Sequence, residues 1–208
     1  MRFDKINNKG QARLFKNQYL EYLTKTNPLV IWSLYLPILF LFPNYAVKHF
    51  YWGASKVFFV YSVGFVFWTL IEYILHRFVF HHHPKTKFGE KINYIIHGNH
   101  HEYPRDKERL FMPPLPSIII SSSFFSLFYF VMNKNAFVFF PGFMFGYLIY
   151  GSMHYAIHAF NPPFKWMKSL WRNHHLHHYK HAELGFGVSS TLWDHVFGTM
   201  FDMKKIRD

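Results

Sequence analysis

Long apolar segments alternate with polar, histidine-rich segments along this chain. Four segments are nearly free of charge, and they run over Leu29–Phe42, Val57–Leu75, Leu115–Met132 and Ala136–Met153. A helix needs about 17–25 mostly apolar residues to cross the hydrocarbon core of a bilayer. The last three segments have that length. The first reaches it only if Asn27–Pro28 and Pro43–Val47 extend it, and otherwise it is a buried core helix.

This pattern predicts an all-α protein, an integral membrane bundle of four transmembrane helices with a cytoplasmic helical cap. We expect one domain over residues 1–208, with an interfacial tail (1–27), four membrane helices (28–160) around a central cytoplasmic segment (77–114), and a cap segment (161–208). The tail has no apolar run, so it is not a cleavable signal peptide. Its apolar residues recur at helical spacing and predict one helix on the membrane surface: Leu14, Phe15, Tyr19, Tyr22 and Leu23.

The basic residues predict the orientation of the bundle. All but three of the 23 Lys and Arg residues lie in the tail, in the central segment or after the fourth apolar segment, the exceptions being Lys48, Lys56 and Lys134. The positive-inside rule then places both termini and the central segment in the cytoplasm. The same asymmetry explains the net charge of +12. A nucleic-acid-binding module would gather its cations on one soluble face, so we expect no nucleic-acid partner.

Histidines are abundant, with 16 against 11 acidic residues, and cysteine is absent. The lack of cysteine excludes thiolate metal sites and iron–sulfur clusters. Ten histidines form four groups at the predicted cytoplasmic ends of the apolar segments. The groups are His76 and His81; His97, His100 and His101; His154 and His158; and His174, His177 and His178.

Helical geometry brings the members of a group together. Residues at i, i+3 and i+4 share one helix face, so three of the groups can each aim their rings at a common point. His76 and His81 lie about 140° apart on an ideal helix, so we expect one of them past the helix end. Ten imidazoles are too many for one ion, and leaving them buried and unpaired would be costly, so two divalent ions are the economical interpretation. Spacing does not choose between iron, zinc and copper.

The other six histidines lack a partner at helical spacing or point away from the shared faces. We expect no ligand among them, and they are His49, His82, His83, His175, His181 and His195.

Three carboxylates accompany the histidine groups. Glu72 lies in an apolar segment four residues before His76, where it can accept the second ring N–H of that histidine or pair with Arg77. Asp106 can pair with Arg109 or contact a ligand, and Asp194 has the same two interpretations. We expect the glycines at positions 185 and 187 to form a tight turn under the site.

The residues around these groups resemble the fatty acid hydroxylase/sterol desaturase superfamily of membrane di-metal enzymes, and within it the fatty acid 2-hydroxylase branch. The resemblance covers Asn27 to Phe201 and is carried by EYILHRFVFH (72–81), HGNHHEYPRDKERLFMPP (97–114), YGSMHYAIH (150–158) and HHLHHYKHAELGFGVSSTLWDHVFGT (174–199). Two positions depart from the branch. Gly151 stands where an acidic residue is common, and Ala159 stands where another histidine is frequent.

The resemblance implies that the ten grouped histidines are the metal ligands, and the positions of Glu72, Asp106 and Asp194 make them candidates to support the ligands. It implies two iron ions, which zinc can replace in a purified protein, with O2 as co-substrate. The reaction is then hydroxylation of a fatty acyl chain at C2, in a free fatty acid or a ceramide, since no acid, base or nucleophile breaks such a C–H bond. We expect the acyl chain between the second and fourth segments.

Branch members often carry a fused cytochrome b5 domain, which this sequence does not show. We therefore expect a separate electron donor of the cytochrome b5 or ferredoxin type. Two alternatives stay open: a sterol, carotenoid or other lipid oxidase or desaturase of the same superfamily, and a membrane metal transporter or sensor.

Overall fold

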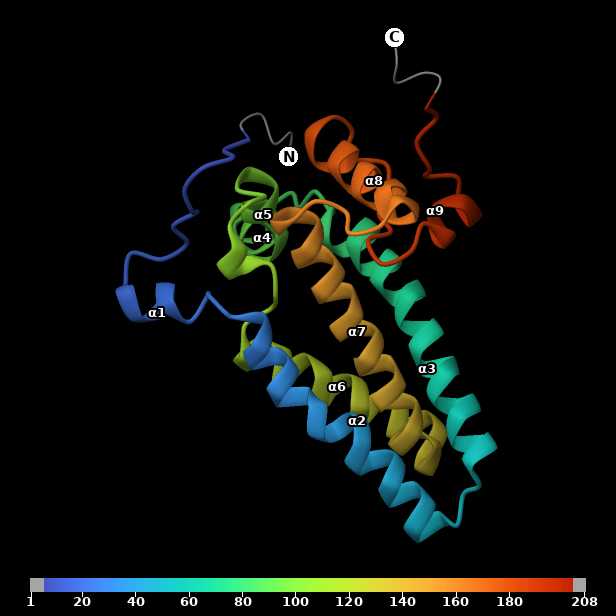
Figure 1. Ribbon diagram of the computed structural model, residues 1–208. Coiled ribbons are helices and arrows are strands. Elements are labelled where there is room, and N and C mark those ends of the chain that lie inside the picture. The colour runs from blue at the N-terminus through green and yellow to red at the C-terminus, as the bar shows by residue number, and fades with distance from the viewer. Residues whose placement is uncertain (1–5, 204–208) are drawn as a thin grey trace.

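The computed structural model describes residues 6–203, which form helices and loops without a strand (Figure 1). Five cations of the charge pattern lie outside the described residues: Arg2, Lys5, Lys204, Lys205 and Arg207. The α-helices are α1 (Gln18–Tyr22), α2 (Pro28–Phe50), α3 (Ala54–Ile74), α4 (Lys87–Asn93), α5 (Asn99–Glu102), α6 (Pro114–Met132), α7 (Ala136–Ala159), α8 (Lys168–Tyr179) and α9 (Leu192–Val196). Two π-helices, η1 (Leu75–Phe80) and η2 (Tyr94–Gly98), and three 3₁₀ turns, η3 (Lys107–Arg109), η4 (Asn133–Asn135) and η5 (Lys165–Met167), complete the elements.

The long helices α2, α3, α6 and α7 form a bundle, and the short helices α4, α5, α8 and α9 gather at one end of it (Figure 1). Helix α7 is the centre of the bundle, since it packs against α3, α2 and α6. Its inward side chains, including Phe143 and Leu148, join Tyr35 of α2 and Trp68 of α3 in the main apolar core. This packing brings η1, which continues α3, and the end of α7 that carries histidines beneath the short helices (Figure 1).

Three helical stretches are long and apolar enough to cross a membrane: Pro28–Phe50, Ala54–Phe80 and Lys107–Ala159. The third is 53 residues long and contains α6 and α7, joined by the turn η4. Only 22%, 22% and 11% of their most apolar windows are buried inside the protein, so these stretches present apolar side chains outward. Such large exposed apolar faces are suited to lipid rather than to water.

Helix α2 shows how the first apolar segment reaches a membrane-crossing length. It begins at Pro28 behind the capping side chain of Asn27 and continues through Pro43 to Phe50. The extension expected from the flanking residues is therefore confirmed. The alternative of a buried core helix is wrong, because most of α2 is exposed.

Small residues let α3 and α7 approach closely. A Cβ at Gly64 would lie 2.1 Å from the carbonyl oxygen of Phe139, and a Cβ at Gly142 would lie 2.0 Å from that of Tyr61. Both distances are far inside van der Waals contact, so only glycine fits there. Close backbone approach through small residues is typical of helix pairs in membranes.

The single surface helix predicted over Leu14–Leu23 is wrong. Helix α1 covers only Gln18–Tyr22, because the Glu21 carboxylate accepts the backbone N–H groups of Leu14 and Phe15, at 2.9 and 2.8 Å. These bonds turn the preceding chain back against α1. The described tail passes beside α5, where the N–H of Asn7 donates to the carbonyl of Glu102 at 2.7 Å, before it reaches α1 (Figure 1).

Candidate metal centre

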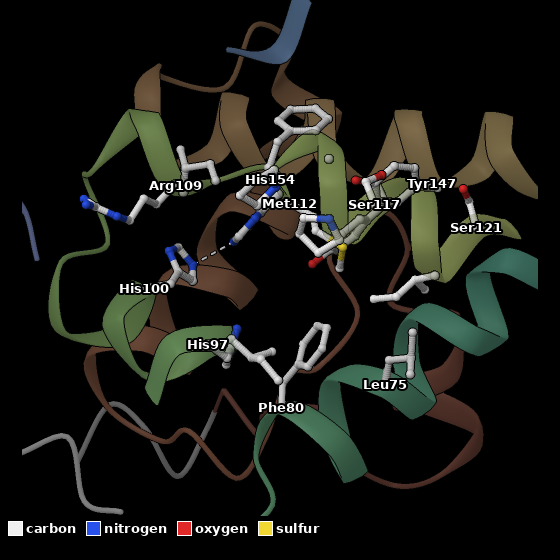
Figure 2. A pocket seen from close by; sticks show the side chains of 18 of the residues that line it. Leu75, Phe80, His97, His100, Arg109, Met112, Ser117, Ser121, Tyr147 and His154 are labelled. Atoms are coloured by element: carbon white, nitrogen blue, oxygen red, sulfur yellow. Dashed lines mark hydrogen bonds between the residues drawn. The ribbon is translucent and has the colours of Figure 1, made fainter. Parts of the chain in front are cut away.

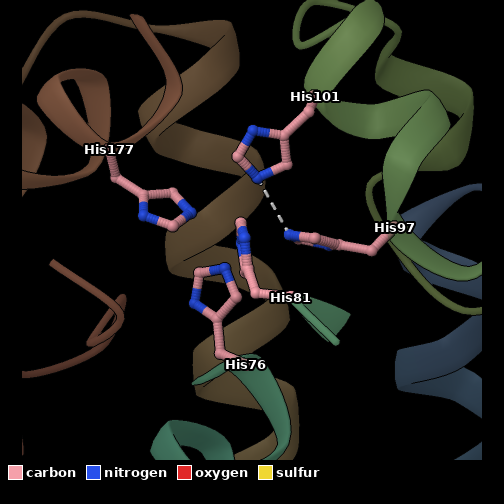
Figure 3. Close-up of side chains that lie close together, drawn as sticks. All are labelled: His76, His81, His97, His101 and His177. Atoms are coloured by element: carbon pink, nitrogen blue, oxygen red, sulfur yellow. Dashed lines mark hydrogen bonds between the residues drawn. The ribbon is translucent and has the colours of Figure 1, made fainter. Parts of the chain in front are cut away.

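The ten grouped histidines converge in two sets of five, and within each set one ring nitrogen per residue lies within 4.8 Å of all the others. The first set is His76, His81, His97, His101 and His177, shown in Figure 3, and the second set is His100, His154, His158, His174 and His178. All are buried except His81, which is half-buried. The two sets adjoin, since the rings of His101 and His178 stack with centroids 4.2 Å apart. The arrangement offers two candidate ion sites, and the expectation of two bound ions stays a prediction.

Each H-x2-H-H group divides between the two sets, so the expectation of a common point is wrong for these two groups, whereas His154 and His158 do lie in one set. His97 and His101 belong to the first set, whereas His100 between them belongs to the second. Helix α8 reverses the pattern, with its middle histidine, His177, in the first set and its outer two in the second. The reason is angular: residues at i and i+4 are about 40° apart on a helix, whereas i+3 and i+4 differ by about 100°. Helices α5 and α8 therefore bridge both sets.

His76 and His81 converge because the chain between them is a π-helix. The backbone N–H of His81 donates to the carbonyl of His76 at 3.2 Å, an i to i+5 bond. Residues five apart then lie about one turn apart and face the same side. His81 is the C-cap of η1, so one of the pair does stand at the helix end, as expected. The π-helix itself was missed, and its side-chain partner is Asn93, whose amide donates to the carbonyl of Phe80 at 2.8 Å.

The donor atoms of the second set test whether a metal ion fits. Nε2 of His174 lies 2.9 Å from Nε2 of His158 and 3.1 Å from Nε2 of His178. A neutral ring nitrogen carries one proton or one lone pair, so these contacts cannot both be hydrogen bonds. Nitrogen ligands held about 2.1 Å from an ion and at right angles stand about 3 Å apart. The spacing of these atoms therefore fits a bound cation.

In the first set, backbone carbonyls orient two of the rings. Nδ1 of His76 donates to the carbonyl of Phe186, and Nδ1 of His177 donates to that of Leu184 at 2.7 Å. Their Nε2 atoms are buried without a hydrogen bond to any described residue. A ring whose Nδ1–H is bound to a carbonyl presents the Nε2 lone pair, which is how protein histidines are held for a metal.

Burial keeps the clustered imidazoles neutral. The pKa values of His97, His100, His174, His177 and His178 lie well below the usual range, first because burial disfavours the charged form and then because neighbouring histidines repel it. Neutral imidazole is the form that binds metal.

Glu72 supports the site through the backbone and not through a ligand. Its carboxylate is buried and accepts the N–H groups of residues 188 and 189, at 2.8 and 2.9 Å, and the hydroxyl of Ser189. The ring N–H of His76 goes to Phe186 instead. Arg77 donates to the hydroxyl of Tyr73. Both sequence-based interpretations of Glu72, as partner of His76 or of Arg77, are therefore wrong.

Asp194 holds the same segment from the other side. It accepts the N–H groups of Phe186 and Gly187, both at 2.9 Å, and the hydroxyl of Thr199 at 2.7 Å. The turn expected at the two glycines is present, since Gly185 has a φ of +70° and a Cβ at Gly187 would lie 2.0 Å from the carbonyl oxygen of Ser190. Glu72 and Asp194 thus fix segment 184–189, whose carbonyls orient two rings of the first set.

Asp106 is a structural partner and not a neighbour of a ligand. It pairs with Arg109 at 2.6 Å, both side chains are almost fully buried, and Arg109 also pairs with Glu21. None of the hydrogen bonds of Asp106 in the described chain goes to a histidine. This ion cluster ties the tail to the segment that leads into α6.

An apolar cavity of about 550 Å³ opens onto both sets (Figure 2). His97 of the first set and His100 and His154 of the second are among its lining residues. The remaining lining comes from one face each of α6 and α7, from η1, η2 and residues 109–113, from Trp68 and Glu72 of α3, and from tail residues such as Leu14 and Leu23. The acyl channel expected between α3 and α7 stays a prediction, and the cavity that could serve it is lined by α6 and α7 with Trp68 and Glu72 of α3. A cavity of this size and lining suits a small apolar ligand.

The model for the family described as fatty acid hydroxylase matches residues 61–199. This chain belongs to the fatty acid hydroxylase family. The matched range contains both histidine sets and the segment that Glu72 and Asp194 hold.

Curated relatives agree with this assignment. The chain is 40% identical over 198 residues to the ceramide very long chain fatty acid hydroxylase SCS7 of Saccharomyces cerevisiae, covering 92% of this chain and 50% of that protein. It is 34% identical over 198 residues to the dihydroceramide fatty acyl 2-hydroxylase FAH1 of Arabidopsis thaliana, covering 94% and 82%. The chain thus spans about half the length of the yeast relative.

A solved structure described as full-length scs7p, with only the hydroxylase domain visible, is similar to the whole described fold. The TM-score is 0.86 at 39% sequence identity, over 93% of this chain and 74% of that one. The fold of this family is therefore shared along nearly the whole chain.

Packing accounts for one departure from the expected family pattern. A Cβ at Gly151 would lie 2.3 Å from the ring of Phe111, so the aromatic ring occupies the space of any larger side chain there. The six histidines expected not to bind metal lie outside both sets. Five of them are exposed, and His175 is half-buried beside His158, with ring centroids 6.4 Å apart.

Proposed function

We propose that this chain hydroxylates a fatty acyl chain at C2, in a free fatty acid or a ceramide, using O2 and two iron ions held by the two histidine sets. One observation carries the proposal: two five-histidine sets lie side by side where an apolar cavity ends. The names of the relatives, which specify ceramide and fatty acyl hydroxylation, support the substrate class.

The ten histidines would hold the ions, five to each. Bound iron supplies the redox chemistry that activates O2, which amino-acid side chains cannot supply. The net reaction consumes O2, two electrons and two protons for each hydroxyl group formed and releases one water. We expect the electrons to come from a carrier of the cytochrome b5 or ferredoxin type.

The protein residues bind and orient the substrate. The apolar side chains of α3, α6 and α7 remove the hydrocarbon chain from water. Each buried methylene group contributes about 0.8 kcal/mol to the free energy of binding. Because His97, His100 and His154 line one end of the cavity, a chain lying in it places one carbon beside both sets. The same apolar walls exclude bulk water from the reacting carbon.

We further propose that α2, α3, α6 and α7 cross the membrane as four helices, with the histidine sets on the cytoplasmic side. The 53-residue apolar stretch containing α6 and α7 supports two crossings, since each helix alone has 19 or more residues. The described Lys and Arg residues outside the bundle lie mostly beside the short helices, whereas Lys48, Lys56 and Lys134 lie at its opposite end. This distribution supports a cytoplasmic site.

Lipid mass spectrometry of cells that express the chain tests the function. We expect 2-hydroxy fatty acids or 2-hydroxyacyl ceramides with the native chain and none with His100→Ala at equal protein level. Oxygenated sterols or carotenoids, or new double bonds, in place of 2-hydroxy lipids would refute it in favour of another oxidase of the superfamily. Metal uptake by vesicles without any lipid product would refute it in favour of a transporter.

A further inference from the structure

The cavity that opens onto the histidine sets ends at one level on all three of its walls. On α7 its lining residues run from His154 back to Phe143 and stop there. On α3 they run back to Trp68 and stop. Along α6 they follow one helix face and stop at Phe124, and they are Pro116, Ser117, Ile120, Ser121 and Phe124. The helices themselves continue beyond this level.

Aromatic rings close the cavity at that level. The ring of Phe143 lies 5.0 Å from that of Phe124 and 5.0 Å from that of Trp68, measured between centroids. One turn further along α6, Phe128 packs against Phe143 at 5.1 Å and against Phe139 at 4.9 Å. Rings in such contact leave no gap for a methylene chain. We call Trp68, Phe124 and Phe143 the aromatic floor.

The side of the cavity is open in contrast. Val79, Ile96 and Ile120 line the cavity and are also 46%, 49% and 43% exposed. These exposed apolar residues lie next to membrane-crossing stretches, where lipid would contact them. An acyl chain can therefore enter sideways from the bilayer, and its methyl end meets the floor.

The depth of the cavity follows from the helix that spans it. His154 and Phe143 are three turns apart on α7, which corresponds to about 16 Å at 1.5 Å per residue. An extended chain advances about 1.2 Å per bond, so this depth holds about 13 carbon–carbon bonds.

We propose that Trp68, Phe124 and Phe143 form a floor that limits the length of the acyl chain whose C2 reaches the histidine sets. The limit is about 14 to 16 carbons for a saturated chain, counted from the carbonyl. This chain would therefore take shorter acyl chains than the yeast relative, whose name specifies very long chain fatty acids. This inference rests on the proposed function for the meaning of C2, but the floor itself is a property of the cavity.

Two substitutions in α6 test the aromatic floor, one that should lengthen the preferred acyl chain and one that should shorten it. Phe124→Ala removes one ring and opens about one helical turn, so the preferred chain becomes about four carbons longer. Ile120→Phe places a ring one turn nearer the histidines at a partly exposed position, so the preferred chain becomes about four carbons shorter. Phe143 itself is left unchanged because it is fully buried in the core.

Phe125→Ala is the matched control. Its ring packs against Phe42 and Phe137, at 5.4 and 5.6 Å, and does not line the cavity. This substitution should destabilise the helix bundle to a similar degree without changing the preferred length of the acyl chain.

Two measurements separate failure of the floor from failure of the function. Purified native and variant proteins are first given a radiolabelled acid of about 16 carbons in competition with saturated fatty acids of about 12 to 24 carbons, added one chain length at a time, and bound label is counted. The 2-hydroxy products of the same acids in expressing cells are then measured by chain length. The preferred fatty acid should become longer in Phe124→Ala and shorter in Ile120→Phe. These opposite changes in the binding assay support the aromatic floor even where no product forms.

The floor is overturned if the native protein binds acids of about 24 carbons as well as those of about 16, or if both variants keep the native binding profile. Identical shifts with the Phe125→Ala control would also overturn it, since they would reflect general loosening of the bundle. Absence of 2-hydroxy products from the native protein would count against the proposed function alone.

Discussion

Some side chains belong to the two histidine sets, and others position the segments that orient those histidines. His100 and His177 stand between histidines of the other set, so each belongs to a different site from its close neighbours in sequence. Glu72 and Asp194 touch no ligand ring and act through the backbone carbonyls of segment 184–189. Replacing a ligand and replacing a supporting carboxylate should therefore have different signatures.

Replacing one ligand should empty one site more than the other. We expect His177→Ala to lose most of the metal of the first set and His100→Ala most of that of the second, with loss of hydroxylation in both. Metal content per protein would be measured by elemental analysis after purification. The control is His49→Ala, an exposed residue that should retain both ions and full activity. Full metal content in His100→Ala would contradict the assignment.

The buried histidines also predict how the metal-free protein responds to acid. Their pKa values are lowered in the folded state, so below about pH 6.5 the unfolded chain binds more protons than the folded one. The free energy of unfolding of the metal-free protein is therefore highest above about pH 6.5. It falls by up to about 1.4 kcal/mol per pH unit for each such histidine as the pH drops further.

Thermal unfolding of chelator-treated protein in detergent, followed from pH 8 to about pH 5, measures this effect. The midpoint should be nearly constant above about pH 6.5 and fall steeply below it. A midpoint that stays level, or one that rises on acidification, would show that the rings are not buried in the neutral form.

Short elements give the site its shape. The π-helix η1 turns His76 and His81 to one side, and the side-chain amides of Asn93 and Asn99 donate to the carbonyls of Phe80 in η1 and Tyr94 in η2. Segment 184–189 works in the same manner, because two carboxylates fix its N–H groups while its carbonyls point at His76 and His177. The geometry of the first set thus depends on elements that contribute no ligand themselves.

Asp194→Asn should weaken the first set selectively. An amide offers one oxygen where the carboxylate accepts three donors, so at least one buried N–H loses its partner, which costs about 1–3 kcal/mol. We expect a lower unfolding midpoint and a lower metal affinity in the first set, with the second set unchanged. Glu183→Gln, at an exposed position of the neighbouring loop, is the control. Equal weakening of both sets would contradict the positioning role of segment 184–189.

The molecule as a whole combines an apolar bundle with a polar end that holds both sets. Because α7 lies at the centre and runs from η4 to His158, one helix links the far end of the bundle to the histidines. The cavity follows the same direction between α3, α6 and α7. The apolar cavity and the end that holds both histidine sets therefore lie along the direction of α7.

The chain contains no cysteine, so a single introduced cysteine reports the side of the membrane on which it lies. We expect Lys180→Cys to be labelled only after permeabilisation of intact cells, and Lys56→Cys and Lys134→Cys to be labelled from outside by an impermeant maleimide. The opposite pattern would reverse the orientation, and labelling of Lys56→Cys and Lys134→Cys from different sides would contradict four crossings.

The sequence alone was enough to predict apolar helices, a family, and the ten histidines that gather, because hydrophobic length and repeated H-x2-H-H spacing are local properties of the chain. It could not assign those histidines to two sets, since helical spacing separates His100 from His97 and His101, but only the packing of distant segments decides which rings meet. It also could not show that Glu72 reaches segment 188–189, more than 100 residues away, or that aromatic rings of three helices close the cavity. Those arrangements depend on contacts between distant segments, which local spacing does not encode.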